Sequence, residues 1–272
     1  MKVRLVKPIG VFRLYVRIPY ERDFSTSSTG VFCYYLWLKC LSYVHPRLAS
    51  DIHDWKGVKP ITVTPLLDTS RGRYLVAGSV EPGTYVTELR VVGSDLIEFF
   101  TQALNDVLSR GFIEIRSGVI PVITGEIIVY EKFSVKESIS KFRIVFRTPA
   151  QLSKRTLERG RWYRLFPVCE YLAYNLAHLW NVLICDPVID IDRLVVWSHE
   201  HVHETRYRLR TVKVPVGEGR WTRGFVGWVE YTVSSPDCEE KRWFAVLLEF
   251  AKYMGVGKSR AIGMGVVDVV FR

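Results

Sequence analysis

The stretch Phe244–Val270, FAVLLEFAKYMGVGKSRAIGMGVVDVV, holds the most informative pattern in this chain. Its first eleven residues end an amphipathic helix predicted for Cys238–Met254, and Gly255 is a residue type that commonly stops a helix. The apolar segment Val266–Phe271 then predicts a last strand. Between them, the run Gly255–Gly265 contains four glycines and two cations. The chain therefore passes from helix to strand through a loop of unusual composition.

This glycine-rich loop predicts binding of a phosphate-bearing ligand. Glycine has no side chain, so backbone N–H groups can approach a phosphate closely. Cationic and hydroxyl side chains in the same run supply charge and hydrogen-bond donors. A turn rich in glycine for packing reasons alone is the alternative. The residues expected to bind are Gly255, Gly257, Lys258, Ser259, Arg260, Gly263 and Gly265.

A nucleotide-binding P-loop does not explain the run, although Gly257-Lys258-Ser259 matches the end of that motif. The motif requires a glycine at position 252, which is Lys252 here. A P-loop also leads from a strand into a helix, whose N-terminus receives the phosphate. The order here is the reverse.

The two halves of the chain repeat one order of helices and strands. In the first half, hydrophobic periodicity predicts a strand, a helical stretch, two further strand regions, a helix capped by Ser94, and closing strands. Their ranges are Val11–Ile18, Gly30–His53, Ile61–Leu66, a hairpin at Tyr74–Val92, Ser94–Arg110, Phe112–Val119 and Gly125–Phe133. The second half predicts Phe142–Phe146, a helix at Leu165–Leu183, strands around Leu194–Trp197, Tyr207–Val214 and Gly224–Val233, then the helix and strand already described.

This order is ferredoxin-like. We therefore expect an α+β fold of two tandem ferredoxin-like domains with antiparallel sheets, resembling RNA-recognition modules. The polar stretch Ser134–Ser140 is the best junction, which gives domains at 1–138 and 139–272.

Charge is the most informative feature of the composition. The chain has 272 residues, with 38 Lys and Arg against 28 Asp and Glu, a net charge of +10 and a pI of about 9.4. An excess of this size favours a polyanionic partner such as nucleic acid. No stretch approaches the roughly 18 apolar residues of a membrane helix, and the five scattered cysteines lack zinc-site spacing. We expect a cytoplasmic protein, and the few Asn and Gln residues hint at a thermophilic source.

The glycine-rich loop and three other segments resemble those of a known protein family. A helix, then Gly-x-Gly-x5-Gly-x-Gly, then a last strand is similar to the C-terminal signature of the CRISPR-associated repeat-associated protein superfamily. The segments Leu48–Asp54 (LASDIHD), Lys59–Leu66 (KPITVTPL) and Phe142–Leu152 (FRIVFRTPAQL) resemble the sixth CRISPR-associated family. Its members are endoribonucleases that cut precursor CRISPR RNA within its repeats. The resemblance implies tandem ferredoxin-like domains and repeat RNA as the partner.

Metal-free RNA cleavage by the 2′-hydroxyl needs a base, an acid and a cation at the phosphorane. Histidine suits proton transfer and lysine suits the charge. The resemblance assigns His53 as base or acid and Lys59 as the stabilising cation. It places a tyrosine at position 38, where this chain has Leu38, so Tyr35, one helical turn earlier beside Tyr34, is the expected substitute. His45, before Pro46, is better interpreted as a residue at a helix end.

Three further clusters consist of basic residues or histidines. Arg206, Arg208 and Arg210 alternate on a predicted strand, so they share one face and are expected to contact RNA. A second basic cluster lies between Lys141 and Arg164. His199, His201 and His203 alternate as well, but strand spacing prevents all three from sharing a metal ion without bending. We therefore expect no metal site and no cofactor.

The sequence thus predicts a metal-independent endoribonuclease that leaves 5′-hydroxyl and 2′,3′-cyclic phosphate ends. The alternative is a non-catalytic CRISPR RNA-binding subunit, because Leu38 stands where the family has a tyrosine. A metal-dependent hydrolase built on the histidine cluster is a weaker third interpretation. Expected partners are precursor CRISPR RNA and proteins of a CRISPR effector complex, with the chain as monomer or homodimer.

Overall fold

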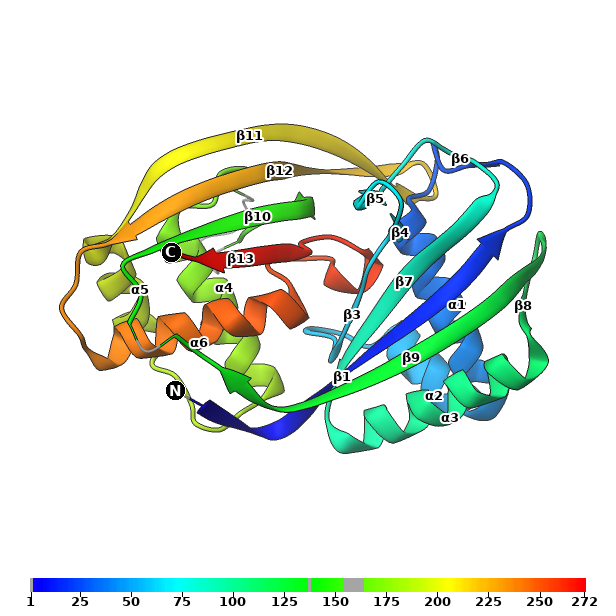
Figure 1. The fold of residues 1–272 in the computed structure, drawn as a ribbon, viewed down its shortest axis with the longest axis horizontal. Coiled ribbons are helices and arrows are strands. Elements are labelled where there is room, and N and C mark those ends of the chain that lie inside the picture. Colours follow the sequence, from blue (N-terminus) through cyan, green and yellow to red (C-terminus); the bar gives the residue numbers. More distant parts are fainter. Residues whose placement is uncertain (1, 137, 154–163) are drawn as a thin grey trace.

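The computed structural model describes residues 2–136, 138–153 and 164–272. Its described part has two larger antiparallel sheets with helices packed on one face of each, and one small two-stranded sheet. The two halves lie side by side (Figure 1). This is an α+β fold with tandem ferredoxin-like domains, as the repeated order of elements predicts.

The N-terminal sheet has the strand order β5-β4-β7-β1-β9-β8, with β3 also paired to β7. Strands β1, β3 with β4, β7 and β9 stand in the spatial order of a ferredoxin-like motif, where the fourth strand lies beside the first. Helices α1, α2 and α3 cover the face that carries Phe12, Leu14 and Val16. The elements are β1 (Lys2–Ile18), β2 (Arg22–Asp23), α1 (Thr29–Val44), α2 (Pro46–Asp54), β3 (Ile61–Val63), β4 (Leu66–Asp68), β5 (Arg73–Leu75), β6 (Ser79–Val80), β7 (Gly83–Val92), α3 (Ser94–Arg110), β8 (Phe112–Ile115) and β9 (Gly118–Ser134).

The C-terminal sheet has the order β11-β12-β10-β13, which is the same motif. Phe142, Ile144 and Phe146 alternate inward along β10 and pack against α4 and α6. The elements are β10 (Lys141–Ala150), α4 (Cys169–Leu183), α5 (Ile191–His201), β11 (Val202–Gly217), β12 (Arg220–Val233), α6 (Glu239–Met254), the short 3-10 helix η1 (Arg260–Ile262) and β13 (Val267–Phe271).

Several sequence expectations are corrected in detail. Leu194–Trp197 is not a strand but part of α5, which Asp190 caps by accepting a hydrogen bond of 3.0 Å from the Arg193 backbone N–H. The predicted helical stretch is two helices, because proline at position 46 cannot continue α1. Ser94 does not cap α3: Gly93 occupies that position and no side chain bonds there. Tyr74–Val92 is no hairpin, since β5 pairs with β4 and β7 pairs with β1.

The two halves share packing around α6. Strands β1 and β9 are long enough to run from the N-terminal sheet to beneath α6 (Figure 1). There the Tyr253 ring of α6 lies 4.6 Å from Tyr130 and stacks at 5.1 Å on Phe133, measured between centroids. Phe133 is buried in the same core cluster as α4 and β10. The C-terminal core thus includes residues from the N-terminal strands.

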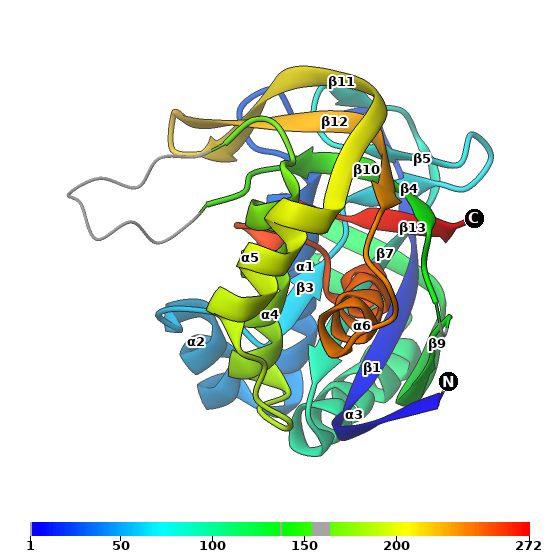
Figure 2. The same ribbon diagram turned by 90° about the vertical axis from the view of Figure 1, so that its left-hand side faces the viewer.

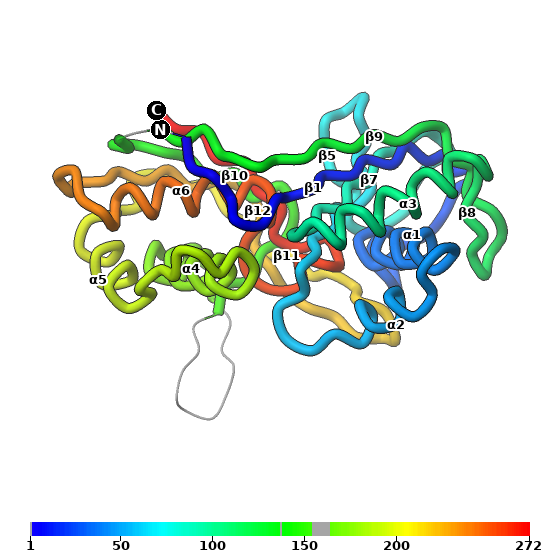
Figure 3. The backbone as a smooth tube through the Cα atoms, turned by 90° about the horizontal axis from the view of Figure 1, so that it is seen from below, coloured from blue at the N-terminus to red at the C-terminus, as the bar shows by residue number. Residues whose placement is uncertain are grey.

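The hairpin of β11 and β12 reaches across to the other half. In Figure 1 it extends from the C-terminal sheet toward the beginning of α1, and Figure 2 shows it at the top of the molecule. Val216 near its tip forms a bridge with Ser27, and the Ser28 backbone N–H donates to the Pro215 carbonyl at 2.9 Å. Figure 3 shows α2 and α4 on the same side of the molecule, below the sheets. Among the described helices, none combines the length and apolar character needed to cross a membrane.

Candidate active site

The predicted residues His53 and Lys59 meet at the C-terminal end of α2. After Asp54 the chain turns through Gly57, whose φ of +94° favours glycine, and returns into β3. The Lys59 Nζ donates to the His53 carbonyl at 2.7 Å and to the Ile52 carbonyl. Because the last carbonyls of a helix lack partners within it, this ammonium caps α2 and fixes the backbone at His53.

The His53 imidazole is half-exposed at the surface. Its Nδ1 lies 2.9 Å from Asp54 Oδ1, and within the described residues Nε2 has no partner. The ring packs against Tyr34 and Tyr35, with centroid distances of 6.5 and 6.2 Å. An oriented imidazole with one nitrogen open to solvent can accept or donate a proton.

Two tyrosines of α1 adjoin His53, and they differ in exposure. Tyr35, the predicted substitute, is 54% exposed, whereas Tyr34 is buried. The Tyr34 hydroxyl accepts the third hydrogen bond of Lys59 Nζ, at 3.1 Å. Leu38 is only 7% exposed and belongs to the core. The sequence interpretation missed this contact of Tyr34, although its position four residues before Leu38 puts both on one helix face.

Burial alters the acidity of both partners in this contact. It lowers the pKa of Lys59, and the nearby Asp54 carboxylate opposes that shift. Burial, with smaller contributions from Tyr35 and Asp54, raises the pKa of Tyr34 to about 12. The Tyr34 hydroxyl is therefore protonated near neutral pH and acts as a hydrogen-bonding group.

The glycine-rich loop packs against the protein's own backbone. A side chain on Gly257 would place its Cβ 2.0 Å from the Gln151 carbonyl oxygen, and one on Gly265 would meet that of Val256 at the same distance. A Cβ on Gly263 would lie 2.8 Å from the Pro65 ring and 2.9 Å from the Gly30 Cα, and Gly255 ends α6 with a φ of +71°. These glycines allow close contact between chain segments, which is the packing alternative to ligand approach.

Arg260 is not placed to touch a phosphate, because its side chain is buried with 6% exposure. Its guanidinium donates to Thr62 Oγ1 at 2.8 Å, to the Met254 carbonyl at 3.1 Å and to the Lys59 carbonyl at 3.3 Å. Burial lowers its pKa to about 10, so it keeps its charge at neutral pH. Arg260 joins the end of α6 to β3, through Thr62, and to the preceding segment that carries Lys59.

Lys258 and Ser259 are the polar residues of the loop that reach the surface. Ser259 is exposed and Lys258 partly so. The Lys258 backbone N–H donates to the Gln151 carbonyl at 3.1 Å, which fixes the loop there. Of the predicted cations of this loop, Lys258 is therefore the accessible one.

The predicted arginines of β11 are exposed together on the edge of the C-terminal sheet. Arg206, Arg208 and Arg210 pair across the sheet with Glu230, Trp228 and Val226, so they share one face. Arg143 lies on that face too, with its guanidinium 4.5 Å from the Trp228 ring centroid. A hydrogen bond from Arg143 holds the pKa of Glu230 below its usual value. This face points away from α4 and α6. Of the second basic cluster, Lys154, Arg155, Arg159 and Arg161 lie outside the described residues.

The three histidines near residue 200 do not share a strand. His199 and His201 are in the last turn of α5 and only His203 is on β11. His199 Nδ1 is instead 3.0 Å from Glu170 Oε1. In the described ranges, no cluster of three or more His, Cys, Asp or Glu could hold a metal ion. His45 lies between α1 and α2 with its Nε2 2.7 Å from Gln102 Oε1, as expected for a residue at a helix end.

The chain is similar to known proteins in sequence and in fold. The family model of the CRISPR-associated endoribonuclease Cas6 matches residues 144–267. The chain is 27% identical over 251 residues to CRISPR-associated endoribonuclease Cas6 2 of Saccharolobus solfataricus, covering 84% of this chain and 85% of that protein.

Solved structures show the same fold. A Cas6 product complex superposes with a TM-score of 0.75 at 20% identity, over 97% of this chain and all of the other. Thermus thermophilus Cas6 gives 0.69 at 20% identity, over 97% of this chain and 99% of its own. The family match and the similarity in sequence show that the chain resembles the CRISPR-associated Cas6 endoribonucleases, and the solved structures show that it shares their fold.

Proposed function

We propose that this protein binds CRISPR repeat RNA and cuts precursor CRISPR RNA by attack of a 2′-hydroxyl on the neighbouring phosphorus. The observation that carries the proposal is the meeting of an oriented, exposed imidazole with an ammonium at the end of α2. His53 is held by Asp54 and the tyrosine rings, and Lys59 is anchored beneath it. These groups match the proton carrier and the cation that the reaction needs.

In the proposed reaction, the 2′-oxygen forms a bond to phosphorus while the bond to the 5′-oxygen breaks. His53 takes the proton of the 2′-hydroxyl or delivers one to the leaving oxygen, and the exposed Tyr35 hydroxyl is the candidate for the other transfer. The products are a 2′,3′-cyclic phosphate and a 5′-hydroxyl. Because all three protons of Lys59 are bonded to protein oxygens, contact with the phosphorane requires exchange of one of these bonds. Imidazole and ammonium supply both proton transfer and charge, so the proposed mechanism needs no metal.

RNA recognition is proposed for the C-terminal half, residues 139–272, and cleavage for residues 1–138. Lys258 and Ser259 on the glycine-rich loop and the three exposed arginines of β11 are the proposed phosphate contacts. Arg260 is proposed to act indirectly, through the backbone of Lys59. Phosphate contacts of this kind make affinity fall with salt concentration.

The test is cleavage of repeat RNA in EDTA by wild type, His53→Ala, Lys59→Ala and the matched control His45→Ala. We expect wild type and His45→Ala to cut, and the other two to lose at least about 100-fold in rate, since acid–base catalysis contributes factors of this order. A deoxynucleotide immediately 5′ of the scissile phosphate should block cleavage but permit binding. Cleavage that persists in His53→Ala would reject the site, and loss of wild-type cleavage in EDTA would reject the metal-free mechanism.

A non-catalytic RNA-binding subunit of an effector complex is the second candidate. The observation that favours it is Leu38, which lies in the core where the resemblance places a tyrosine. Binding of repeat RNA by wild type without cleavage would support this candidate over the enzyme.

A further inference from the structure

A groove lies beside His53 on the side of α1 where the helix begins. It runs between α1, the β2 segment and the turn that joins β8 to β9, and its volume is about 1010 Å³. Tyr35 lines this groove and also packs on the His53 ring. Tyr35 thus belongs both to this groove, here called the α1 groove, and to the surroundings of His53.

Three cations line the groove, and within the described part of the chain none of them pairs with a carboxylate. Arg22 donates to Ser117 Oγ, Lys39 lies 4.8 Å from the ring centroid of Tyr43, and Arg116 is exposed. Of the two acids in the lining, Glu114 is exposed, and Asp23 already accepts from the Ser25 N–H at 2.8 Å and its hydroxyl at 2.6 Å. Cations without carboxylate partners favour an anionic occupant.

Aromatic rings lie among these cations. Tyr35 is exposed, and the partly exposed Phe32 ring has the Arg22 guanidinium 5.4 Å from its centroid. Phe24 supports Phe32 edge to face at 5.3 Å. Alternating cations and aromatic faces bind single-stranded nucleic acid by holding phosphates while bases stack.

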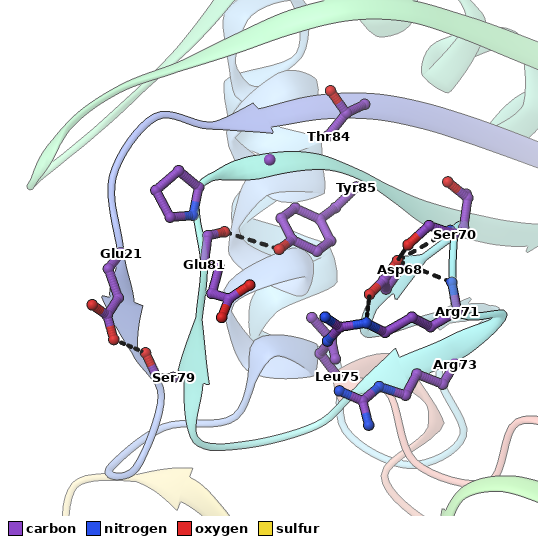
Figure 4. A pocket seen from close by; sticks show the side chains of 13 residues that line it. Glu21, Asp68, Ser70, Arg71, Arg73, Leu75, Ser79, Glu81, Thr84 and Tyr85 are labelled. Carbon is purple, nitrogen blue, oxygen red and sulfur yellow. Dashed lines mark hydrogen bonds and ion pairs between the residues drawn. The ribbon is translucent and has the colours of Figure 1, made fainter.

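A second pocket of the same domain provides a contrast (Figure 4). There Asp68 accepts from the backbone N–H groups of Ser70 and Arg71 and pairs with the Arg71 guanidinium at 3.6 Å. Tyr85 donates to the Glu81 carbonyl at 2.9 Å. Its lining holds three acids, Glu21, Asp68 and Glu81, against two arginines, so this pocket lacks the excess of cations that distinguishes the α1 groove.

We propose that the α1 groove binds the unpaired nucleotides that directly adjoin the scissile phosphate, with their phosphates on Lys39 and Arg116 and a base on Tyr35 or Phe32. This subsite rests on the proposed function, because its role is to position the RNA strand beside His53. It would make cleavage depend on single-stranded RNA next to the cut.

The test compares Lys39→Ala/Arg116→Ala with Arg71→Ala/Arg242→Ala, a control that removes the same charge from two arginines paired to Asp68 and Asp237. Binding is measured over a range of salt concentrations with repeat RNA that carries the blocking deoxynucleotide. Two lost contacts to a single strand should reduce the slope of log Kd against log salt by about 1.4. The control should keep the wild-type slope.

A second arm uses repeat RNAs truncated one nucleotide beyond the scissile phosphate, on the 5′ side or on the 3′ side. One of the two truncated RNAs should bind wild type about as weakly as full-length RNA binds the double variant. On that truncated RNA, the double substitution should cause no further loss of affinity. Equal effects of the substitution on full and on both truncated RNAs would overturn the subsite. Absence of cleavage by wild type would instead reject the proposed function, while the binding arms would still test the groove.

Discussion

At Lys59, one side chain combines a structural contact with a proposed chemical role. Its ammonium caps α2 and holds the backbone of the residue proposed to move protons. Burial lowers its pKa, so it loses its proton at lower pH than a lysine in water, whose pKa is about 10.4. The charge proposed to stabilise the phosphorane is therefore lost sooner as pH rises.

This gives a prediction for the pH profile. Wild-type cleavage, corrected for alkaline hydrolysis of RNA, should fall as pH rises through the lowered pKa of Lys59. Lys59→Arg should be slower by about 10- to 100-fold because its fork cannot reproduce the three contacts, but its rate should stay level over that interval since arginine remains charged. Single-turnover rates measured from pH 7 to pH 10 provide the check. An identical alkaline decline in both proteins would mean that the charge of Lys59 does not contribute.

The residues around His53 show what sequence can and cannot predict. His53 and Lys59 could be paired from spacing, because a short segment must bring the end of α2 back into β3. The choice between Tyr34 and Tyr35 could not, since it depends on how α1 rotates against the sheet and so on which hydroxyl is buried beside Lys59. The role of Arg260 was equally hidden, because two of its acceptors, Thr62 and the Lys59 carbonyl, lie about 200 residues away in the chain.

Among the elements, the glycine-rich loop separates into a surface part and a buried part. Lys258→Ala should reduce the slope of log Kd against log salt by about 0.7 to 0.9, the effect of one phosphate contact.

Arg260→Met should keep the wild-type slope but slow cleavage, because the Lys59 backbone loses a donor. We expect it also to reduce the free energy of unfolding by about 2 to 4 kcal/mol, since buried acceptors are left unpaired. Urea unfolding and salt-dependent binding of both variants test this division. A slope change in Arg260→Met equal to that in Lys258→Ala would show that Arg260 reaches phosphate itself.

Most elements were predictable because their periodicity agrees with their tertiary environment. The range of α3 matches the prediction residue for residue, and Phe100, Ala103, Leu104 and Val107 are buried at helical spacing, whereas Leu108 is exposed. The error at α5 has a clear cause. A short apolar run, Leu194–Trp197, fits a buried strand as well as a helix, and only packing of Leu194 and Trp197 into the core, one turn apart, decides for the helix.

Across the whole molecule, arginines join the two halves at the C-terminal end of α6. Arg90 of β7 donates to the carbonyls of Lys252 and Tyr253, each at 2.9 Å, and pairs with Glu88 at 2.6 Å. Burial alone would raise the pKa of Glu88, but Arg90 and Arg13 together lower it. Glu88 therefore stays ionised and keeps Arg90 oriented toward the helix.

Arg90→Met should therefore weaken the attachment of the two halves. We expect a loss of about 2 to 4 kcal/mol in the free energy of unfolding, because the helix carbonyls lose their donor and the largely buried Glu88 carboxylate keeps only Arg13. Arg242→Ala, which removes an exposed arginine of α6, should change it by no more than about 0.5 kcal/mol. Chemical denaturation followed by tryptophan fluorescence measures both. Equal stability of the two variants would mean that Arg90 does not couple the halves.

The position of α6 has a consequence for how RNA is received. This helix belongs to the C-terminal core, and its Tyr253 stacks there on strands that come from the N-terminal sheet. A hinge between the halves would have to pull these rings apart. We therefore expect the RNA-binding surface to be preorganised, so that binding of RNA costs little free energy for rearrangement of the protein.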